Sequence, residues 1–404
     1  MEHRIVKPRN MRILLVNCAV STSYFSEIFT SLKIKPETSI QNYFNLLYKG
    51  LSNSSCDLFS LSERQISTEE KGIYVQGKRD KDEYASYYYV PKILIPGLSQ
   101  FLSFVTNFFV ALYTIIKFNP DVIICDVMRF YISTPSLLAS RILRKKCIGY
   151  VADLPQMYNH QSMTKTTRIQ SFFKSLYSLP LRFYDGYILL SMYMNHMVNP
   201  NNKPNIILEG LTELDAKSFN PPKISSHYSK TTFMYAGGLH EKYGVRLLID
   251  AVLRSKCDIE LWLFGKGDQE NYLQQISSNR IKFFGYQPRN FVIQKQTEVD
   301  FLINPRFTNE EYTKYSFPSK IMEYMASGTP VVTTRVKGIP DDYFKYLIPI
   351  EHEDIEGFEQ MFKECCEMSI EKRLKLGCQA SNYVRHNKNC NVQGRRLYTW
   401  LNCL

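Results

Sequence analysis

Two adjacent glycines, Gly237 and Gly238, end an apolar run and stand shortly before Lys242 and a helical pattern. Backbone N–H groups at such a turn can approach an anion closely, and a following helix adds the partial positive charge of its N-terminus. Lys242 would bring a full positive charge to the same place. These groups suit a diphosphate whose negative charge grows as a bond to it breaks. The same residues also fit an ordinary strand-to-helix turn.

A carboxylate, Glu323, lies within about one turn of a predicted helix start, where N–H groups and the positive dipole end gather. Pro318 and Ser319 favour that start, since proline's fixed φ suits a first turn and serine can cap it. A capping box would need Ser, Thr, Asp or Asn three residues before Glu323, but Lys320 stands there. Glu323 is therefore either a ligand-binding carboxylate or half of a Lys320–Glu323 surface pair.

Three further candidates stand where apolar runs end. Gly265 is the first residue of GKGD, at the end of an apolar run, and Arg306 follows VDFLIN, so it should project at the carboxyl edge of a parallel sheet. Asp153 in YVADLP could accept a hydroxyl proton as a general base. Each also has a purely structural reading: a tight turn for Gly265, a surface loop for Arg306 and a helix cap for Asp153.

The composition limits the classes of partner. A chain of 404 residues leads us to expect two domains. Lys and Arg outnumber Asp and Glu by 50 to 38, which favours an anionic partner such as a phosphorylated substrate or anionic lipid. No long basic run is present, so we expect no nucleic-acid partner. The ten cysteines show neither zinc spacing nor a secreted disulfide pattern, and no signal peptide is evident, which indicates a cytoplasmic protein.

Two aromatic stretches bear on membrane contact. Residues 98–116 carry no charge and reach the length of a transmembrane helix. Polar residues nevertheless fall along one side at helical spacing: Ser99, Ser103, Thr106, Asn107 and Thr114. We therefore expect one packed or interfacial helix. Residues 168–183 form a basic amphipathic stretch, which could rest in a membrane interface or pack on the core.

Strands that alternate with helical stretches predict an α/β chain with doubly wound parallel sheets. In the first half the predicted strands are 12–20, 121–126, 146–153, 185–191 and 205–210. The polar, proline-containing stretch 211–230 predicts a linker between a first domain, 1–210, and a second, 231–385. Residues 386–404 look like a terminal helix.

The segment FPSKIMEYMASGTPVV resembles the donor-binding segment of the retaining glycosyltransferases of family 4, and GGLHEKYG resembles that family's phosphate loop. The resemblance covers roughly residues 205–345 and extends to bacterial surface-polysaccharide glycosyltransferases. It implies the GT-B fold, with two Rossmann-like domains facing a cleft and a terminal helix that crosses back onto the first domain. It also implies sugar transfer from a nucleotide diphosphate sugar with retained anomeric configuration and no required metal.

The resemblance further implies roles for single residues. Glu323 would hydrogen-bond the donor's ribose, and Lys242 would hold the leaving diphosphate, with Asp153 as the candidate base. The donor-binding set would be Gly237, Gly238, Lys242, Gly265, Arg306, Ser316, Phe317, Ser319 and Glu323. The acceptor would be a saccharide or a lipid-linked saccharide presented at the cytoplasmic membrane face, where the protein would bind peripherally.

The chain departs from the family at three places. The family's hallmark is two glutamates separated by seven residues, and Tyr315 stands at the first position, so the donor sugar stays open. Leu239 and His240 stand where the family often has an arginine, for which Arg246 or Arg306 could substitute. The family's glycine-rich loop after the first strand is not evident. Tyr315 keeps two alternatives open, a nucleotide-sugar epimerase and a non-catalytic sugar-nucleotide binding protein.

Overall fold

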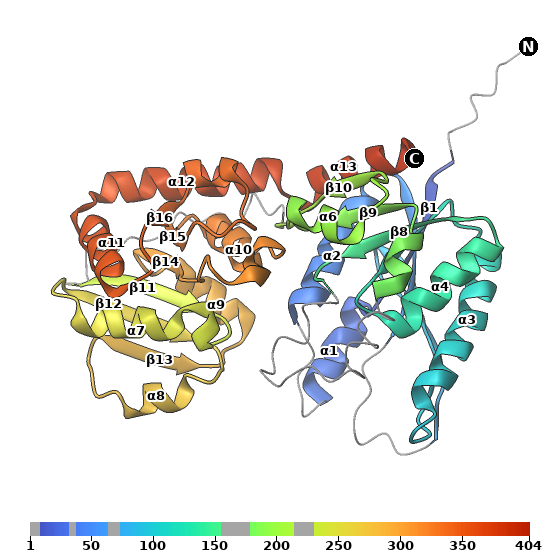
Figure 1. The fold of residues 1–404 in the computed structure, drawn as a ribbon, viewed down its shortest axis with the longest axis horizontal. Coiled ribbons are helices and arrows are strands. Elements are labelled where there is room, and N and C mark those ends of the chain that lie inside the picture. Colours follow the sequence, from blue (N-terminus) through green and yellow to red (C-terminus); the bar gives the residue numbers. More distant parts are fainter. Residues whose placement is uncertain (1–8, 32–37, 64–72, 155–177, 214–229) are drawn as a thin grey trace, which may run out of the picture. The chain divides into compact units, whose positions relative to one another are not determined.

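A computed structural model describes residues 9–31, 38–63, 73–154, 178–213 and 230–404. The chain divides into two compact units: unit 1 comprises Met1–Leu211 and Cys390–Leu404, and unit 2 comprises Thr212–Asn389. Each unit has its own largely parallel sheet (Figure 1), so the predicted α/β fold with two such sheets is confirmed. Most of the predicted linker, residues 214–229, lies outside the described residues.

The main sheet of unit 1 has eight strands in the part of the chain described. Their bounds are β1 Met11–Asn17, β2 Cys56–Ser62, β4 Lys78–Lys81, β5 Ala85–Tyr89, β7 Val122–Asp126, β8 Lys146–Val151, β9 Gly186–Leu189 and β10 Asn205–Ile207. They lie in the order β10-β9-β8-β7-β1-β2-β5-β4, and only β4 runs antiparallel to its neighbour. The two remaining strands, β3 Tyr74–Val75 and β6 Lys92–Ile93, pair with each other. Every residue of β7 is buried, as expected for a strand covered on both faces.

Helices cover both faces of this sheet (Figure 1). Their bounds are α1 Thr22–Ser31, α2 Thr38–Ser52, α3 Ser99–Phe118, α4 Phe130–Ile142, α6 Asn195–Val198 and α13 Cys390–Asn402, with 3-10 turns η2 Leu179–Phe183 and η3 Met192–Met194. The terminal helix α13 packs against α2. Their backbones come very close, because a Cβ built on Gly394 would lie 2.3 Å from the carbonyl carbon of Gly50. The chain end therefore belongs to unit 1.

The uncharged run 98–116 forms a single helix, as predicted. This helix, α3, packs along α4, and its buried residues are Asn107, Ala111, Thr114 and Ile115. Part of the predicted polar stripe thus faces the protein. Among the described residues, α3 is the one helix long and apolar enough to cross a membrane. Most of the basic stretch 168–183 lies outside the described residues.

Unit 2 is a six-stranded parallel sheet with helices on both faces, counted over the described residues. The strands are β11 Thr231–Ala236, β12 Ile259–Phe264, β13 Ile281–Gly285, β14 Phe301–Asn304, β15 Val331–Thr334 and β16 Ile348–Ile350, in the order β13-β12-β11-β14-β15-β16. The helices are α7 Val245–Arg254, α8 Glu270–Gln275, α9 Arg289–Gln296, α10 Ser319–Ser327, α11 Ile355–Glu367 and α12 Ile370–Asn387, with 3-10 turns η5 Glu241–Tyr243, η6 Glu311–Lys314 and η7 Asp341–Lys345.

The side chains of β11 alternate between the two cores of unit 2. Phe233 and Tyr235 pack into the core formed with α7 and α11, whereas Met234 packs into the core formed with α10 and α12. Successive side chains of a strand point to opposite faces, so one short strand fills both layers. This central strand leads directly into the Gly237-Gly238 turn.

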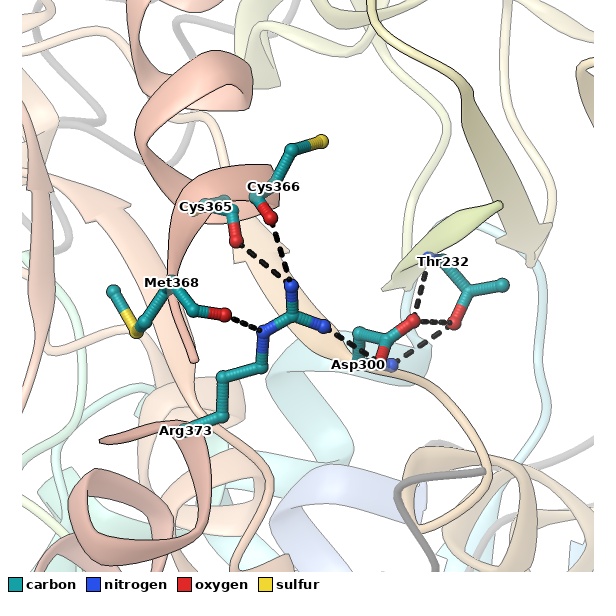
Figure 2. A network of polar contacts seen from close by, with 6 residues as sticks. All are labelled: Thr232, Asp300, Cys365, Cys366, Met368 and Arg373. Atoms are coloured by element: carbon teal, nitrogen blue, oxygen red, sulfur yellow. Dashed lines mark hydrogen bonds and ion pairs between the residues drawn. The ribbon is translucent and has the colours of Figure 1, made fainter. Parts of the chain in front are cut away.

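A buried ion pair joins the starts of β11 and β14 to the helices α11 and α12 (Figure 2). Arg373 Nη1 donates to Asp300 Oδ1 at 3.0 Å, and the backbone N–H and the hydroxyl of Thr232 both donate to Asp300 Oδ2 at 2.8 Å. The remaining guanidinium N–H groups donate to the carbonyls of Cys365 and Met368. The side chains of Asp300 and Arg373 are only 10% and 9% exposed, so every polar atom here depends on its partner.

We expect Arg373→Met to lower the free energy of unfolding by about 3–5 kcal/mol, because Asp300 would keep a buried charge without its partner. Urea denaturation of the variant and the wild type measures this difference. Lys372→Met, at an exposed neighbouring position, is the matched control and should change the value by less than about 0.5 kcal/mol. Equal effects of the two substitutions would contradict the prediction.

Candidate active site

The turn after β11 is closely packed against two other segments. Gly237 donates its N–H to the carbonyl of Phe264 at 2.8 Å. Gly265 has φ +130°, and a Cβ on it would lie 1.8 Å from the Gly237 carbonyl oxygen. A Cβ on Gly237 itself would lie 1.6 Å from Lys320 Nζ. Because Gly237 and Gly265 lack side chains, their two turns and the ammonium group of Lys320 can pack closely together. A side chain at either glycine would fill this space.

Lys320 is the functional candidate that sequence reasoning missed. Its Nζ donates to Tyr235 Oη at 3.0 Å and lies 4.3 Å from the centre of the Tyr235 ring. It does not pair with Glu323, which is held by Arg289 and Gln296. Burial and, to a lesser extent, the positive charge of Arg306 lower the pKa of Lys320 to about 7, against a smaller opposing effect of Glu323. A lysine in the first turn of a helix opposes the helix dipole, and that was the available signal.

Arg306 and Lys242 lie against one aromatic ring beside this turn. The Arg306 guanidinium carbon is 5.0 Å from the ring centre of Tyr243, and Lys242 Nζ is 5.3 Å from the same centre. Burial raises the pKa of Tyr235, while nearby Arg306 opposes that rise. The predicted residues Lys242 and Arg306 are thus brought together with Gly237 and Gly238, and Lys320 joins them.

Tyrosine hydroxyls hold the end of β11 in place. Tyr235 Oη donates to the carbonyl of Gly238 at 2.8 Å. The N–H of Ala236 donates to the hydroxyl of Tyr324, a fully buried residue of α10, also at 2.8 Å. The helix that carries Lys320 and Glu323 is therefore fixed directly to the strand that carries the glycine turn.

Glu323 is held by two side chains of α9. Arg289 Nη2 donates to its Oε2 at 3.0 Å, and the amide of buried Gln296 donates to its Oε1 at 2.8 Å. The side chain remains 32% exposed. Carboxylate oxygens have several lone-pair sites, so each can accept a further hydrogen bond from a ligand hydroxyl. The alternative Lys320–Glu323 surface pair is not formed.

The loop before α10 differs in detail from expectation. Pro318 occupies the N-cap position and α10 has no side-chain cap, so the proposed capping by Ser319 is wrong: Ser319 is the exposed first residue of the helix. Its first-turn N–H groups lack intrahelical partners. Phe317 is buried against Tyr343, and the carbonyl of Ser316 lies close to Gly338. Phe317 thus anchors the loop from inside.

Asp153 belongs to unit 1, where it follows β8. Its Oδ1 accepts the N–H of Leu154 at 2.8 Å, a local contact of the kind that caps a chain turn. No described residues form a group of three or more His, Cys, Asp or Glu side chains placed to hold a metal ion.

The lowered pKa of Lys320 predicts a pH-dependent stability. The unfolded chain holds this proton up to about pH 10.4, so between pH 7 and that value the unfolded state binds more protons and the free energy of unfolding rises with pH. Lys320→Met should remove this rise, which is at most about 1.4 kcal/mol per pH unit.

Urea denaturation at pH 6, 7.5 and 9 tests this by the difference between wild type and variant. The free energy of unfolding of Lys320→Met should exceed that of the wild type by the largest amount at pH 6 and by the smallest at pH 9. The exposed Lys337→Met serves as control. A difference that does not change with pH would disprove the proton linkage.

Comparison with known sequences gives a family for this region. Residues 230–367 match the family described as glycosyl transferases group 1. The chain is also 23% identical over 203 residues to WcaL of Escherichia coli K12, which is named as a colanic acid biosynthesis glycosyltransferase. That alignment covers 47% of this chain and 50% of WcaL, so the chain spans about half the length of this curated relative.

Solved structures resemble the chain over nearly its whole length. Sucrose-phosphate synthase from Thermosynechococcus elongatus has a TM-score of 0.68 at 14% identity, covering 97% of this chain and 99% of that one. Anabaena HepE in complex with UDP has a TM-score of 0.63 at 14% identity, covering 98% and 100%. These likenesses establish the fold. The chain therefore has the GT-B fold, and its residues 230–367 are similar to the glycosyl transferases group 1.

Proposed function

We propose that this protein is a glycosyltransferase of surface-polysaccharide biosynthesis, which moves a sugar from a nucleotide diphosphate sugar to a saccharide acceptor. The observation that carries the proposal is the convergence of Lys320, Arg306 and Lys242 on the rings of Tyr235 and Tyr243. This cluster lies within the group 1 domain, and the named role of WcaL supports the polysaccharide context.

The cation cluster suits the leaving diphosphate. Breaking the bond between the sugar's anomeric carbon and the diphosphate oxygen leaves that oxygen with an extra negative charge. Preorganised cations and N–H groups at this position stabilise the charge without rearrangement. Lys242, Arg306 and Lys320 supply the positive charge, so we propose that transfer needs no bound metal.

The carboxylate of Glu323 suits the ribose of the nucleotide. Arg289 and Gln296 fix its orientation, and a fixed carboxylate can accept hydrogen bonds from vicinal hydroxyls. The solved HepE complex contains UDP, which supports a nucleotide in the equivalent fold. The identity of the sugar depends on the region of Tyr315, where the glutamate of related enzymes is replaced.

The new bond forms from an acceptor hydroxyl oxygen to the anomeric carbon with retention, and the hydroxyl proton passes to a base, for which we propose Asp153. We further propose a lipid-linked acceptor and a peripheral position on the cytoplasmic face of the membrane. The net charge of +12 supports contact with anionic lipid.

Incubation with a panel of labelled nucleotide sugars and a crude lipid-linked acceptor fraction tests the proposal. Labelled product on the acceptor supports transfer. An epimerised nucleotide sugar would instead identify an epimerase, one of the two alternatives that Tyr315 keeps open. Tight binding with no reaction of any donor would identify a sugar-nucleotide binding protein.

Glu323→Ala should weaken donor binding by about 1.5–3 kcal/mol, the range for a hydrogen bond to a charged group. Isothermal titration with the active donor measures the affinity, and Glu371→Ala, an exposed position of the same unit, is the control. Unchanged affinity in a folded Glu323→Ala variant would remove Glu323 from the donor site.

Lys242→Ala should lower kcat more than donor affinity, because its charge meets a diphosphate that becomes more negative in the transition state. Steady-state kinetics gives both constants, with the exposed Lys256→Ala as the control. If KM alone rises, Lys242 binds substrate and transition state equally and has no catalytic role.

A further inference from the structure

Helix α3 has its polarity reversed relative to an ordinary surface helix. Phe101, Val105, Phe109 and Tyr113 recur at four-residue intervals, and they are 67%, 37%, 63% and 53% exposed. Residues four apart stand one above the other on a helix, so these side chains form one continuous outward stripe, the α3 stripe. The buried side of the same helix instead includes two polar side chains, Asn107 and Thr114.

A hydrogen bond between helices fixes this orientation of α3. The Asn107 amide donates to the carbonyl of Tyr131 in α4 at 2.8 Å. The Thr114 hydroxyl is satisfied within α3, where it donates to the carbonyl of Val110 at 2.6 Å. Rotating α3 to bury its aromatic stripe would break the bond to α4. A buried donor that loses its partner is destabilising, so the fold holds the stripe outward.

The α3 stripe ends at a cation. Lys117 follows Tyr113 by four residues, and its Nζ lies 5.5 Å from the centre of the Tyr113 ring. On α4, which packs along α3, Arg141 is exposed and forms an ion pair with Asp185 at 2.8 Å, and the exposed Arg144 follows the end of α4. Aromatic and aliphatic side chains beside Lys and Arg are the composition of a helix that lies in the headgroup region of a membrane.

The distribution of charge between the units favours an anionic surface. Unit 1 contains 26 lysines and arginines against 15 aspartates and glutamates, whereas unit 2 contains 24 against 23. Nearly all of the net positive charge of the chain therefore belongs to the unit that carries α3. An anionic leaflet attracts such a unit through each Lys or Arg that comes near the membrane surface.

We propose that α3 is the membrane-docking surface of this protein and inserts Phe101, Phe109 and Tyr113 into the headgroup region of an anionic leaflet. The helix lies in the interface and does not span the bilayer, because its polar face is buried on α4 within unit 1. This inference deepens the proposed function and rests on it for the lipid-linked acceptor, whereas docking itself requires no transfer activity.

Co-sedimentation of the full chain with phosphatidylglycerol–phosphatidylcholine vesicles tests the docking surface. The double variant F101Q/F109Q should lose at least tenfold in partition coefficient, because two large apolar groups no longer leave water. Ile370→Gln, on α12 of unit 2 and 48% exposed in the wild type, is the matched control and should bind as the wild type does. Lys117→Glu should weaken binding to anionic vesicles only, and added salt should weaken wild-type binding without abolishing it.

A second variant reports insertion directly. Phe109→Trp should shift its fluorescence to shorter wavelength on vesicle binding and should be quenched by lipids brominated near the headgroup end of the chains. Unchanged vesicle binding of F101Q/F109Q, or an unshifted spectrum of bound Phe109→Trp, would overturn the proposal.

Other occupants of the stripe give different results. If a segment of the chain itself covers it, F101Q/F109Q lowers the thermal midpoint without lipid; if a second copy covers it, the variant abolishes a dimer seen in the wild type. Either result overturns membrane docking. Thermal shift with UDP and other nucleoside diphosphates, in the absence of vesicles, separates the two proposals. If F101Q/F109Q still binds vesicles as the wild type does and still shows the nucleotide-induced shift, only the assignment of α3 as the docking surface is refuted. If the wild type shows no nucleotide-induced shift, the result counts against the donor site and not against docking.

Discussion

The position of the candidate site depends on an ion pair at the opposite end of the strands that carry it. Asp300 stands just before β14 and binds Thr232 at the start of β11, while Arg373 ties Asp300 to the end of α11. These two parallel strands run from that network to the glycine turn and to Arg306 respectively. A shift of one strand against the other would separate the groups that converge on Tyr243. The buried pair thus contributes alignment, which a pair of apolar side chains would specify less well.

At the carboxyl ends of the strands, a partly buried cation lowers the stability of the fold. Lys320 is held beside Arg306 in a partly buried place, where its ammonium group is disfavoured and its pKa falls to about 7. An apolar side chain would pack there without that cost. Sites that bind anions collect such unfavourable cations because the ligand supplies the missing partner. The rest of unit 2, with its two apolar cores and buried ion pair, offsets this local loss.

Much of this architecture could be predicted from the sequence because its signals are local. Buried strands such as β7 and β12 are largely apolar runs, and the turn at Gly237 is marked by the glycines themselves. The direction of a long side chain, in contrast, is not determined by its neighbours in the sequence. Lys320 reaches Tyr235, 85 residues earlier, and only the packing of α10 on β11 decides that it turns there and away from Glu323. Likewise, the partners of Glu323 come from α9, at positions that no spacing rule connects to it.

The buried face of helix α3 also could not be predicted from the sequence alone. The sequence reveals two faces, one polar and one aromatic, but the usual rule that apolar residues turn inward would assign them the wrong way round. Asn107 decides the matter, because its amide finds the carbonyl of Tyr131 in the interior, where a hydrogen bond is strong and a lost one is costly. One polar contact thereby leaves several aromatic side chains in water. Covering these exposed aromatic side chains lowers the free energy when the covering surface is apolar and compatible with the charge of Lys117. An anionic lipid interface meets both conditions.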